Sequence, residues 1–139
     1  MQFTIFADGG ARGNPGPSGA GAVVRNAQGK TVAGVSKFLG HQTNNFAEYE
    51  AVILAFEEIA KLVPQAKRKD TEIMVKMDSM LVVKQMMGEW KVKHPNMKPQ
   101  HARLRALEEK FGKVSFAHIY REENADADAL ANEAMDRGA

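Results

Sequence analysis

The sequence predicts an α/β or α+β protein in which a sheet carries helices on both faces. Two short apolar segments that end in aspartate, residues 1–8 and 72–78, are typical of strands, and a stretch of helical length lies between them at residues 41–63. Two further strand-like runs flank a glycine-containing turn at residues 27–29, which predicts an antiparallel hairpin. Strands that precede helices after such a hairpin favour an α/β or α+β arrangement.

The first half of the chain supplies three strands and a long helix. The strand at residues 1–8 has apolar side chains on both faces, as expected of a central strand. Hairpin strands follow at residues 19–26 and 30–40. Between residues 41 and 63, apolar side chains recur at helical spacing in two adjacent stripes, so this helix should be broadly buried. Thr43 or Asn44 can cap its start, and Pro64 ends it.

The second half continues with two strands and three helices. After a polar connector at residues 64–71, residues 72–78 alternate as a strand and residues 79–87 predict a short helix that Gly88 stops. A basic connector at residues 88–99 leads to a helix at residues 99–111, which has proline in its first turn, and to a last strand at residues 114–120. Asn124 is expected to cap the final helix.

Composition narrows the class of protein. The 139 residues suit one domain, and the absence of cysteine excludes thiolate metal sites, so any metal must use oxygen or imidazole ligands. The longest apolar run, at residues 51–56, is far below the roughly 20 residues of a membrane span, and the start of the chain lacks a secretory signal, so a cytoplasmic protein is expected. A net charge of +2 does not by itself indicate nucleic-acid binding.

Asp8 and Asp78 each end a predicted strand. If those strands are neighbours, both carboxylates open onto one edge of the sheet, where a hard cation such as Mg²⁺ or Mn²⁺ would relieve their repulsion. Either aspartate taken alone is also an ordinary turn residue.

In residues 6–21, FADGGARGNPGPSGAG, the strand is expected to end at Asp8 and a loop rich in glycine to follow directly. The segment contains six glycines, which raises the question of phosphate binding. The segment lacks the Lys-Ser or Lys-Thr of a P-loop, and the spacing of its glycines after Asp8 does not satisfy G-x-G-x-x-G. The hairpin segment VRNAQGKT contains Gly-Lys-Thr but has Val24 in place of the first P-loop glycine. Nucleotide binding through these motifs is therefore disfavoured.

Four segments in the right order and spacing resemble type 1 ribonuclease H. They are FADGGARGNPGPSGAG, QTNNFAEYEA from residue 42, KMDSMLVVKQM from residue 76 and HIYREENADADALANEA from residue 118. The resemblance spans nearly the whole chain and implies one ribonuclease H domain over residues 1–139. The implied fold is the ribonuclease H-like fold, a five-stranded mixed sheet with helices on both faces.

The resemblance implies a set of four carboxylates that are both catalytic and metal-binding: Asp8, Glu48, Asp78 and Asp128. Asp128 is preferred over Asp126 because it precedes Ala-Leu-Ala as the family pattern requires, with Asp126 as the fallback. By resemblance, two Mg²⁺ ions about 4 Å apart, with Mn²⁺ as a substitute, would activate water and stabilise the leaving 3′ oxygen. Hydrolysis would leave a 5′ phosphate and a 3′ hydroxyl.

The implied substrate is an RNA/DNA hybrid, read through the 2′ hydroxyls of its RNA strand. The substrate-binding residues implied by the resemblance are Gly9, Gly10, Ala11, Asn14, Asn44 and Asn45 for the RNA side, Trp90, Lys91 and Lys93 for the DNA strand, and Ser79, which is assigned to neither strand. Two of these have simpler interpretations. Asn44 can serve as a helix cap, and Trp90 can anchor a core beside a solvated loop.

The chain departs from parts of the family pattern. The connector at residues 88–99 is too short for the extra basic helix of some members, which predicts weaker and more salt-sensitive hybrid binding. Arg121 or Glu122 occupies the region where many members carry a mobile histidine, and Met80 follows Ser79 where some have a polar group. The alternatives are a module that binds hybrid or double-stranded RNA without cutting, and a nuclease of this fold that also cuts double-stranded RNA. A monomer without membrane contacts is expected.

Overall fold

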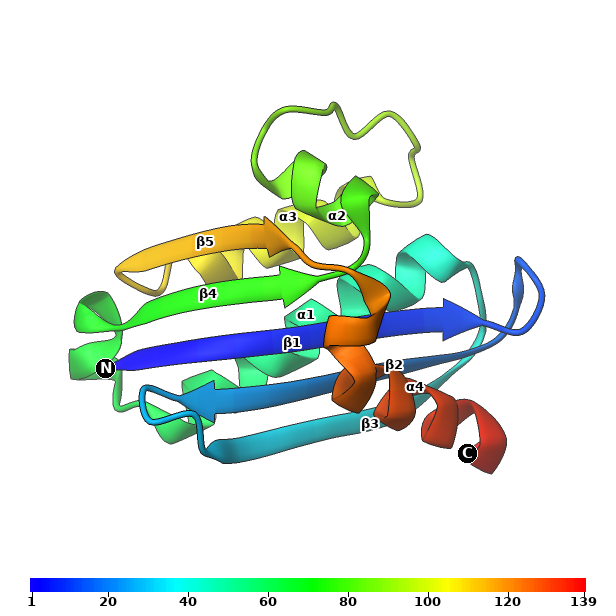
Figure 1. The fold of residues 1–139 in the computed structure, drawn as a ribbon. Helices are drawn as coiled ribbons and strands as arrows, with labels where there is room; N and C mark the ends of the chain where they lie inside the picture. The colour runs from blue at the N-terminus through cyan, green and yellow to red at the C-terminus, as the bar shows by residue number, and fades with distance from the viewer.

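The computed structural model describes residues 1–139 and contains one five-stranded sheet in the order β3-β2-β1-β4-β5 (Figure 1). The first three strands pair antiparallel, whereas β4 and β5 continue the sheet parallel to β1. The sheet is therefore mixed, as predicted. The strands are β1 (Gln2–Ala11), β2 (Gly16–Asn26), β3 (Thr31–Gln42), β4 (Glu72–Met77) and β5 (Lys113–His118).

Helices cover both faces of the sheet, which confirms the predicted layering. On one face α1 packs against β1, β2 and β3, and α3 packs on α1; on the other face α4 lies across the same three strands (Figure 1). Two 3₁₀ helices, η1 and η2, precede β4 and α4, so the polar connector after Pro64 is partly helical. The bounds are α1 (Asn44–Leu62), η1 (Gln65–Asp70), α2 (Met80–Met86), α3 (Lys98–Glu108), η2 (Arg121–Asn124) and α4 (Ala125–Arg137).

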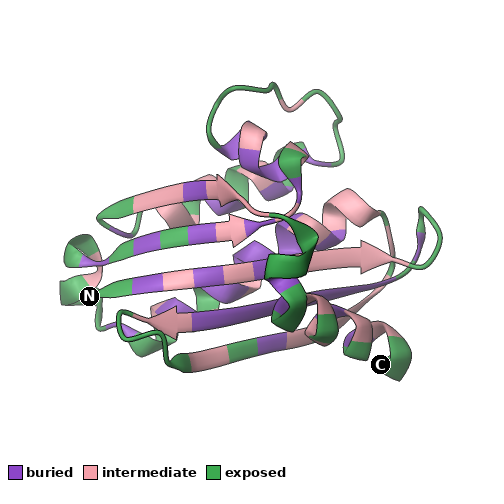
Figure 2. Cartoon of the chain, viewed as in Figure 1, coloured by how far each residue is buried: buried purple, intermediate pink, exposed green.

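The core lies between the sheet and α1. Residues Tyr49, Ile53 and Phe56 of α1 are fully buried, and the inward side chains of β4 alternate with exposed ones as the sequence predicts (Figure 2). The opposite face is less completely covered, because α4 crosses only part of it and leaves Met74 36% exposed. No helix is both long and apolar enough to cross a bilayer.

The glycine-rich segment is mostly strand, so the prediction that it forms a loop directly after Asp8 was wrong. The β1–β2 ladder continues past Asp8, which pairs with Gly21, and only residues 12–15 lie outside the strands. The glycines permit close packing of helices against these strands. A Cβ on Gly9 would lie 2.2 Å from the carbonyl carbon of Ala47 in α1, and one on Gly21 would lie 2.3 Å from the carbonyl oxygen of Ala127 in α4.

The helix caps differ in part from expectation. The Thr43 hydroxyl accepts a hydrogen bond from the Phe46 amide at 3.2 Å, so Thr43 rather than Asn44 caps α1. Asn124 occupies the N-cap position of α4, as predicted, but its side chain makes no capping hydrogen bond. Its side chain is buried, and the amide group donates to the carbonyl of Ala7 in the central strand β1 at 2.8 Å.

Candidate active site

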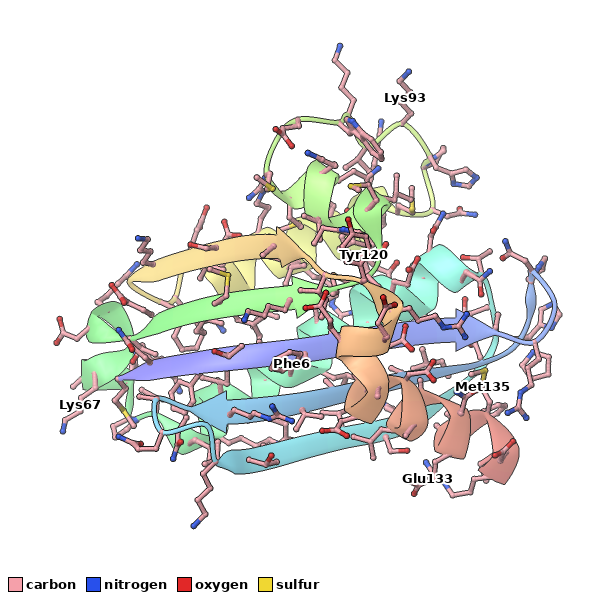
Figure 3. The ribbon with its side chains drawn as sticks, in the orientation of Figure 1. Phe6, Lys67, Lys93, Tyr120, Glu133 and Met135 are labelled. Atoms are coloured by element: carbon pink, nitrogen blue, oxygen red, sulfur yellow. The ribbon has the colours of Figure 1, made fainter.

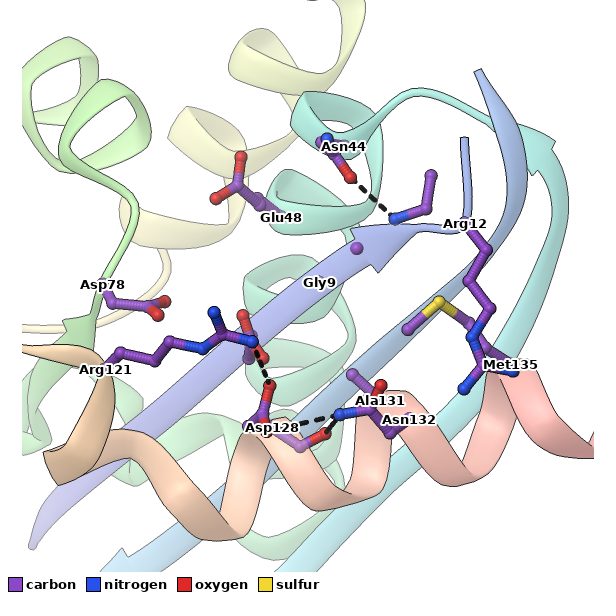
Figure 4. Close-up of a pocket in the computed structure, with 13 residues that line it drawn as sticks. Gly9, Arg12, Asn44, Glu48, Asp78, Arg121, Asp128, Ala131, Asn132 and Met135 are labelled. Atoms are coloured by element: carbon purple, nitrogen blue, oxygen red, sulfur yellow. Dashed lines mark hydrogen bonds and ion pairs between the residues drawn. The ribbon is translucent and has the colours of Figure 1, made fainter. Parts of the chain in front are cut away.

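Four acidic side chains from four different elements line one cleft of about 360 Å³: Asp8 of β1, Glu48 of α1, Asp78 just after β4, and Asp128 of α4 (Figure 4). The parallel register of β1 and β4 explains part of this arrangement. Ala7 lies opposite Met77, so the next residue of each chain segment, Asp8 or Asp78, emerges at the same level of the sheet. All four predicted carboxylates thus lie together.

Backbone contacts and two asparagines hold these side chains in place. The close approach of Gly9 to α1 sets Asp8 beside the helix turn that carries Glu48. The Asn132 amide donates to the backbone carbonyl of Asp128 at 3.0 Å and to its carboxylate at 3.3 Å (Figure 4). Asn124, whose Nδ2 bonds the Ala7 carbonyl, also lies 3.5 Å from the Asp78 carboxylate. Its buried Oδ1 has no partner.

The cleft disfavours negative charge on two of its carboxylates, Asp8 and Glu48. Burial, a hydrogen bond with Asp128 and the nearby charges of Asp78, Asp128 and Glu48 together raise the pKa of Asp8 to about 8. Burial likewise raises the pKa of Glu48 to about 7, with repulsion from Asp78 adding to it and a hydrogen bond with Ser79 opposing it. In the metal-free chain these groups therefore hold protons that a bound cation would displace.

The donor set fits hard divalent cations. The four predicted ligands offer only carboxylate oxygens, which Mg²⁺ and Mn²⁺ prefer, and their mutual repulsion is what a cation would relieve. No three acidic or histidine side chains of the chain yet converge closely enough to enclose an ion. Ion binding would have to draw the carboxylates inward.

Two arginines also line the cleft, and sequence reasoning assigned a role to neither. Arg121 of η2 extends toward the acidic residues, with its guanidinium 3.9 Å from the Asp128 carboxylate (Figure 4). Of the two residues considered for the histidine region, Arg121 lines this cleft and Glu122 does not. Arg12 lines the opposite end and pairs with Asp136. The i, i+4 spacing from Asp128 could have revealed Asn132, whereas only the tertiary fold reveals Arg12.

Asp126 and Asp128 occupy different surroundings, although they are two residues apart. Asp126 is exposed and pairs with Arg25 at 2.8 Å, outside the carboxylate cleft. Asp128 is less exposed and faces Asp8 within it. The geometry therefore favours Asp128 over the fallback.

The residues expected to contact RNA divide between two adjoining clefts. Gly9, Gly10, Ala11 and Asn44 line the carboxylate cleft. Asn14 and Asn45 line a second cleft of about 500 Å³, whose walls also include Thr43, His94 and Asn96. The Asn44 side-chain oxygen accepts from the Ala11 amide at 2.7 Å, and the Asn14 side-chain oxygen accepts from the Asn44 amide at 3.1 Å, so hydrogen bonds tie the two clefts together.

The remaining predicted contacts lie elsewhere. Ser79 is buried, and its hydroxyl caps α2 by accepting from the Val82 amide at 3.3 Å. Trp90, Lys91 and Lys93 lie on the exposed connector between α2 and α3 and line neither cleft (Figure 3 labels Lys93). Trp90 is 47% exposed, so it is not a core anchor.

The strand order and the carboxylate cleft together define the ribonuclease H-like class of α/β protein. Comparison with known proteins places the chain more narrowly. A family model described as reverse transcriptase-like matches residues 6–134. The ribonuclease HI of Halobacterium salinarum is 40% identical over 131 residues, which cover 94% of this chain and 63% of that protein.

Two further matches agree. The bifunctional protein Rv2228c of Mycobacterium tuberculosis is 46% identical over 140 residues, covering all of this chain and 37% of that protein. The crystal structure of LC11-RNase H1 in complex with an RNA/DNA hybrid superposes with a TM-score of 0.91 at 44% identity, covering 97% of each chain. The chain belongs to the type 1 ribonuclease H family. It spans between about a third and two thirds of the two curated relatives.

Proposed function

We propose that residues 1–139 act as one ribonuclease H domain that hydrolyses the RNA strand of RNA/DNA hybrids from within, leaving 5′-phosphate and 3′-hydroxyl ends. The observation that carries this proposal is the cleft where Asp8, Glu48, Asp78 and Asp128 meet. Membership of the ribonuclease HI family and the hybrid bound to LC11-RNase H1 support the choice of substrate.

The four carboxylates would hold two Mg²⁺ ions, which when bound supply a polarised water and a stabilising charge for the leaving oxygen. Asp8 is suited to the shared, central position because it lies within a strand, paired on one side with Gly21, and interacts with each of the other three carboxylates. Asp128 would complete the water side, with Asn132 keeping its carboxylate oriented. Glu48 and Asp78 would serve the side of the leaving group.

Recognition of RNA would use amide groups at the edge of the cleft. The side-chain oxygens of Asn14 and Asn44 already accept backbone hydrogen bonds, whereas their Nδ2 groups donate to no protein atom. These groups are therefore available to donate to 2′ hydroxyls, the feature that separates RNA from DNA. Asn45 and the backbone of Gly9, Gly10 and Ala11 would complete this contact with the RNA strand, whereas Ser79 is buried and would not touch the substrate.

The DNA strand would follow the connector between α2 and α3. Trp90, Lys91 and Lys93 are exposed there and offer one stacking surface and two phosphate contacts. The connector has only eleven residues, 87–97, between the two helices and forms no helix of its own. Its small size favours testing a second substrate, double-stranded RNA, beside the hybrid.

The test is cleavage of end-labelled RNA/DNA hybrid, double-stranded RNA and double-stranded DNA with Mg²⁺ or Mn²⁺. We expect the hybrid to be cut in its RNA strand and Asp8→Asn to reduce the rate roughly a thousandfold or more while hybrid binding persists. Asp128→Asn should do the same. Asp126→Asn is the matched control, because Asp126 faces Arg25 outside the cleft, and it should cut normally.

Binding and cleavage together distinguish the hybrid-specific nuclease from a binding module and from a nuclease that also cuts double-stranded RNA. Hybrid binding without any metal-dependent cleavage by the unaltered protein would leave only the binding module. Comparable cutting of double-stranded RNA would establish the broader nuclease.

A further inference from the structure

Arg12 stands in the short loop between β1 and β2, directly after the glycine segment. It lines the same cleft as the four carboxylates, and its side chain is 48% exposed. Its guanidinium pairs at 2.5 Å with Asp136, near the end of α4 (Figure 4 shows the Arg12 side chain). Asp136 is not one of the four carboxylates and is itself 68% exposed.

This ion pair is easily exchanged. Both side chains lie largely in water, where such pairs contribute little to stability because solvent screens them. A guanidinium binds a phosphate with the same two-pronged geometry as a carboxylate. Replacing Asp136 by a phosphate would therefore cost the protein little.

The backbone that carries Arg12 is fixed, in contrast to its side chain. The Arg12 amide donates to the Pro17 carbonyl at 2.8 Å, and the preceding amide, of Ala11, donates to Asn44. The Arg12 carbonyl packs against Gly16, where a Cβ would lie 2.2 Å away. The Arg12 side chain can therefore change its conformation at the mouth of the cleft while its backbone stays in place.

The charges that line the cleft suggest what Arg12 would bind when it leaves Asp136. Four carboxylates repel an incoming phosphate backbone, and only two cationic side chains line the cleft to oppose them, Arg12 and Arg121. Arg121 faces Asp128, one of the four carboxylates, whereas Arg12 is held outside that set. Arg12 is thus the cation that can be offered to the substrate without disturbing the carboxylates.

We propose that Arg12 binds a non-scissile phosphate of the RNA strand and that Asp136 competes for it in the free protein. This inference rests on the proposed function, because the adjoining residues Gly9, Gly10 and Ala11 are those assigned to the RNA strand. A purely structural role, in which the Arg12–Asp136 ion pair holds the β1–β2 loop against α4, would involve the same two side chains. The two roles differ in what each partner's removal does to binding.

The experiment measures the dissociation constant of RNA/DNA hybrid across a salt series, with Asp8→Asn as the parent protein so that the substrate stays intact. Arg12→Gln should weaken binding roughly fivefold to tenfold near 0.1 M salt and lower the salt slope by about 0.7 to 0.9, as for one lost phosphate contact. Arg12→Lys should retain the slope. Asp136→Asn should tighten binding roughly twofold, because it removes the competing carboxylate.

Arg25→Gln is the matched control. Arg25 also joins the sheet to an exposed aspartate of α4, at 2.8 Å, but lies outside the cleft, so its loss should leave the slope unchanged. If Arg12→Gln and Asp136→Asn weakened hybrid binding equally and each lowered the melting temperature, the ion pair would be purely structural and the proposal would be overturned. An unchanged slope in Arg12→Gln would overturn it as well. Failure of the parent to bind hybrid at all would instead overturn the proposed function and, with it, this inference.

Discussion

The carboxylate cleft and the α2–α3 connector are held in place by different means. Around the cleft, the backbones of strands and helices pack directly against each other: β1 packs on α1 at Gly9, and β2 packs on α4 at Gly21. The connector, residues 87–97, depends on fewer links. The amides of Glu89 and Trp90 donate to the Lys84 carbonyl at 3.0 and 3.2 Å.

One buried chain of hydrogen bonds joins the two regions. The Tyr49 hydroxyl in α1 bonds the Gln85 side chain at 2.6 Å, and the Gln85 amide donates to the Lys91 carbonyl at 3.3 Å. Tyr49 follows Glu48, so the helix that positions a predicted metal ligand also steadies the connector. Catalysis at a phosphate requires carboxylates that packing holds in fixed positions, whereas the long side chains of lysines can contact phosphates from a less rigid connector.

The largest effect is expected from a substitution that pushes β1 away from α1. Gly9→Ala places a Cβ 2.2 to 2.5 Å from the backbone of Ala47 and Glu48, which cannot move aside as a side chain can. We expect the free energy of unfolding to fall by about 3 kcal/mol. Urea unfolding measures this loss, and cleavage should fall with it because Asp8 and Glu48 separate.

Gly10→Ala is the control for the same strand. A Cβ there meets only the tip of Met135 at 3.6 Å, so the free energy of unfolding should stay within about 0.5 kcal/mol of the unaltered value. Similar losses in both variants would show that strand propensity, and not the close approach to α1, sets the stability.

The second prediction concerns charge in the metal-free cleft. The unfolded Asp8 carboxyl loses its proton near pH 3.8, whereas the folded one keeps it up to about pH 8. Between these values the folded state binds more protons, so this group's contribution to stability falls as pH rises. With EDTA at pH 8, Asp8→Asn should therefore be more stable than the unaltered protein by about 2 kcal/mol, below the full shift because the cleft is open to water.

Urea unfolding at pH 4 and pH 8 measures this effect. The two proteins should differ little at pH 4, and Mg²⁺ at pH 8 should narrow the gap by stabilising only the protein that retains Asp8. A gap that is the same at both pH values would contradict the repulsion inferred among the carboxylates.

The smallest effect is expected at the connector. Lys91→Gln with Lys93→Gln should weaken hybrid binding roughly fivefold near 0.1 M salt and lower the salt slope by roughly 1.5, with unfolding unchanged. Lys67→Gln with Lys113→Gln is the control, because both lysines are exposed and lie far from the connector: Lys67 is in η1, before β4 (labelled in Figure 3), and Lys113 is the first residue of β5. An equal loss in the control pair would mean that net charge alone, and not the connector, binds the hybrid.

Much of the fold followed from local patterns. Alternation in residues 72–78 and the apolar stripes of the long helix reflect which side chains are buried, and the turn at Gly29 reflects its positive φ of 79°; a short segment encodes each of these by itself. The carboxylates were selected by resemblance across four segments. The prediction of a loop directly after Asp8 failed because glycine occurs both in loops and in strands on which a helix packs closely, and the local sequence does not distinguish the two.

Local patterns and the resemblance of four segments were thus enough to predict most helices and strands, the mixed sheet and the four candidate carboxylates. The structure was needed to see that β1 continues beyond Asp8, that Asn124 is buried beside Asp78, and that Arg12 lines the cleft. The last two depend on contacts between residues far apart in the chain. Asn124 bonds the Ala7 carbonyl, and Arg12 pairs with Asp136, across more than a hundred residues, and no periodicity within a segment encodes such contacts.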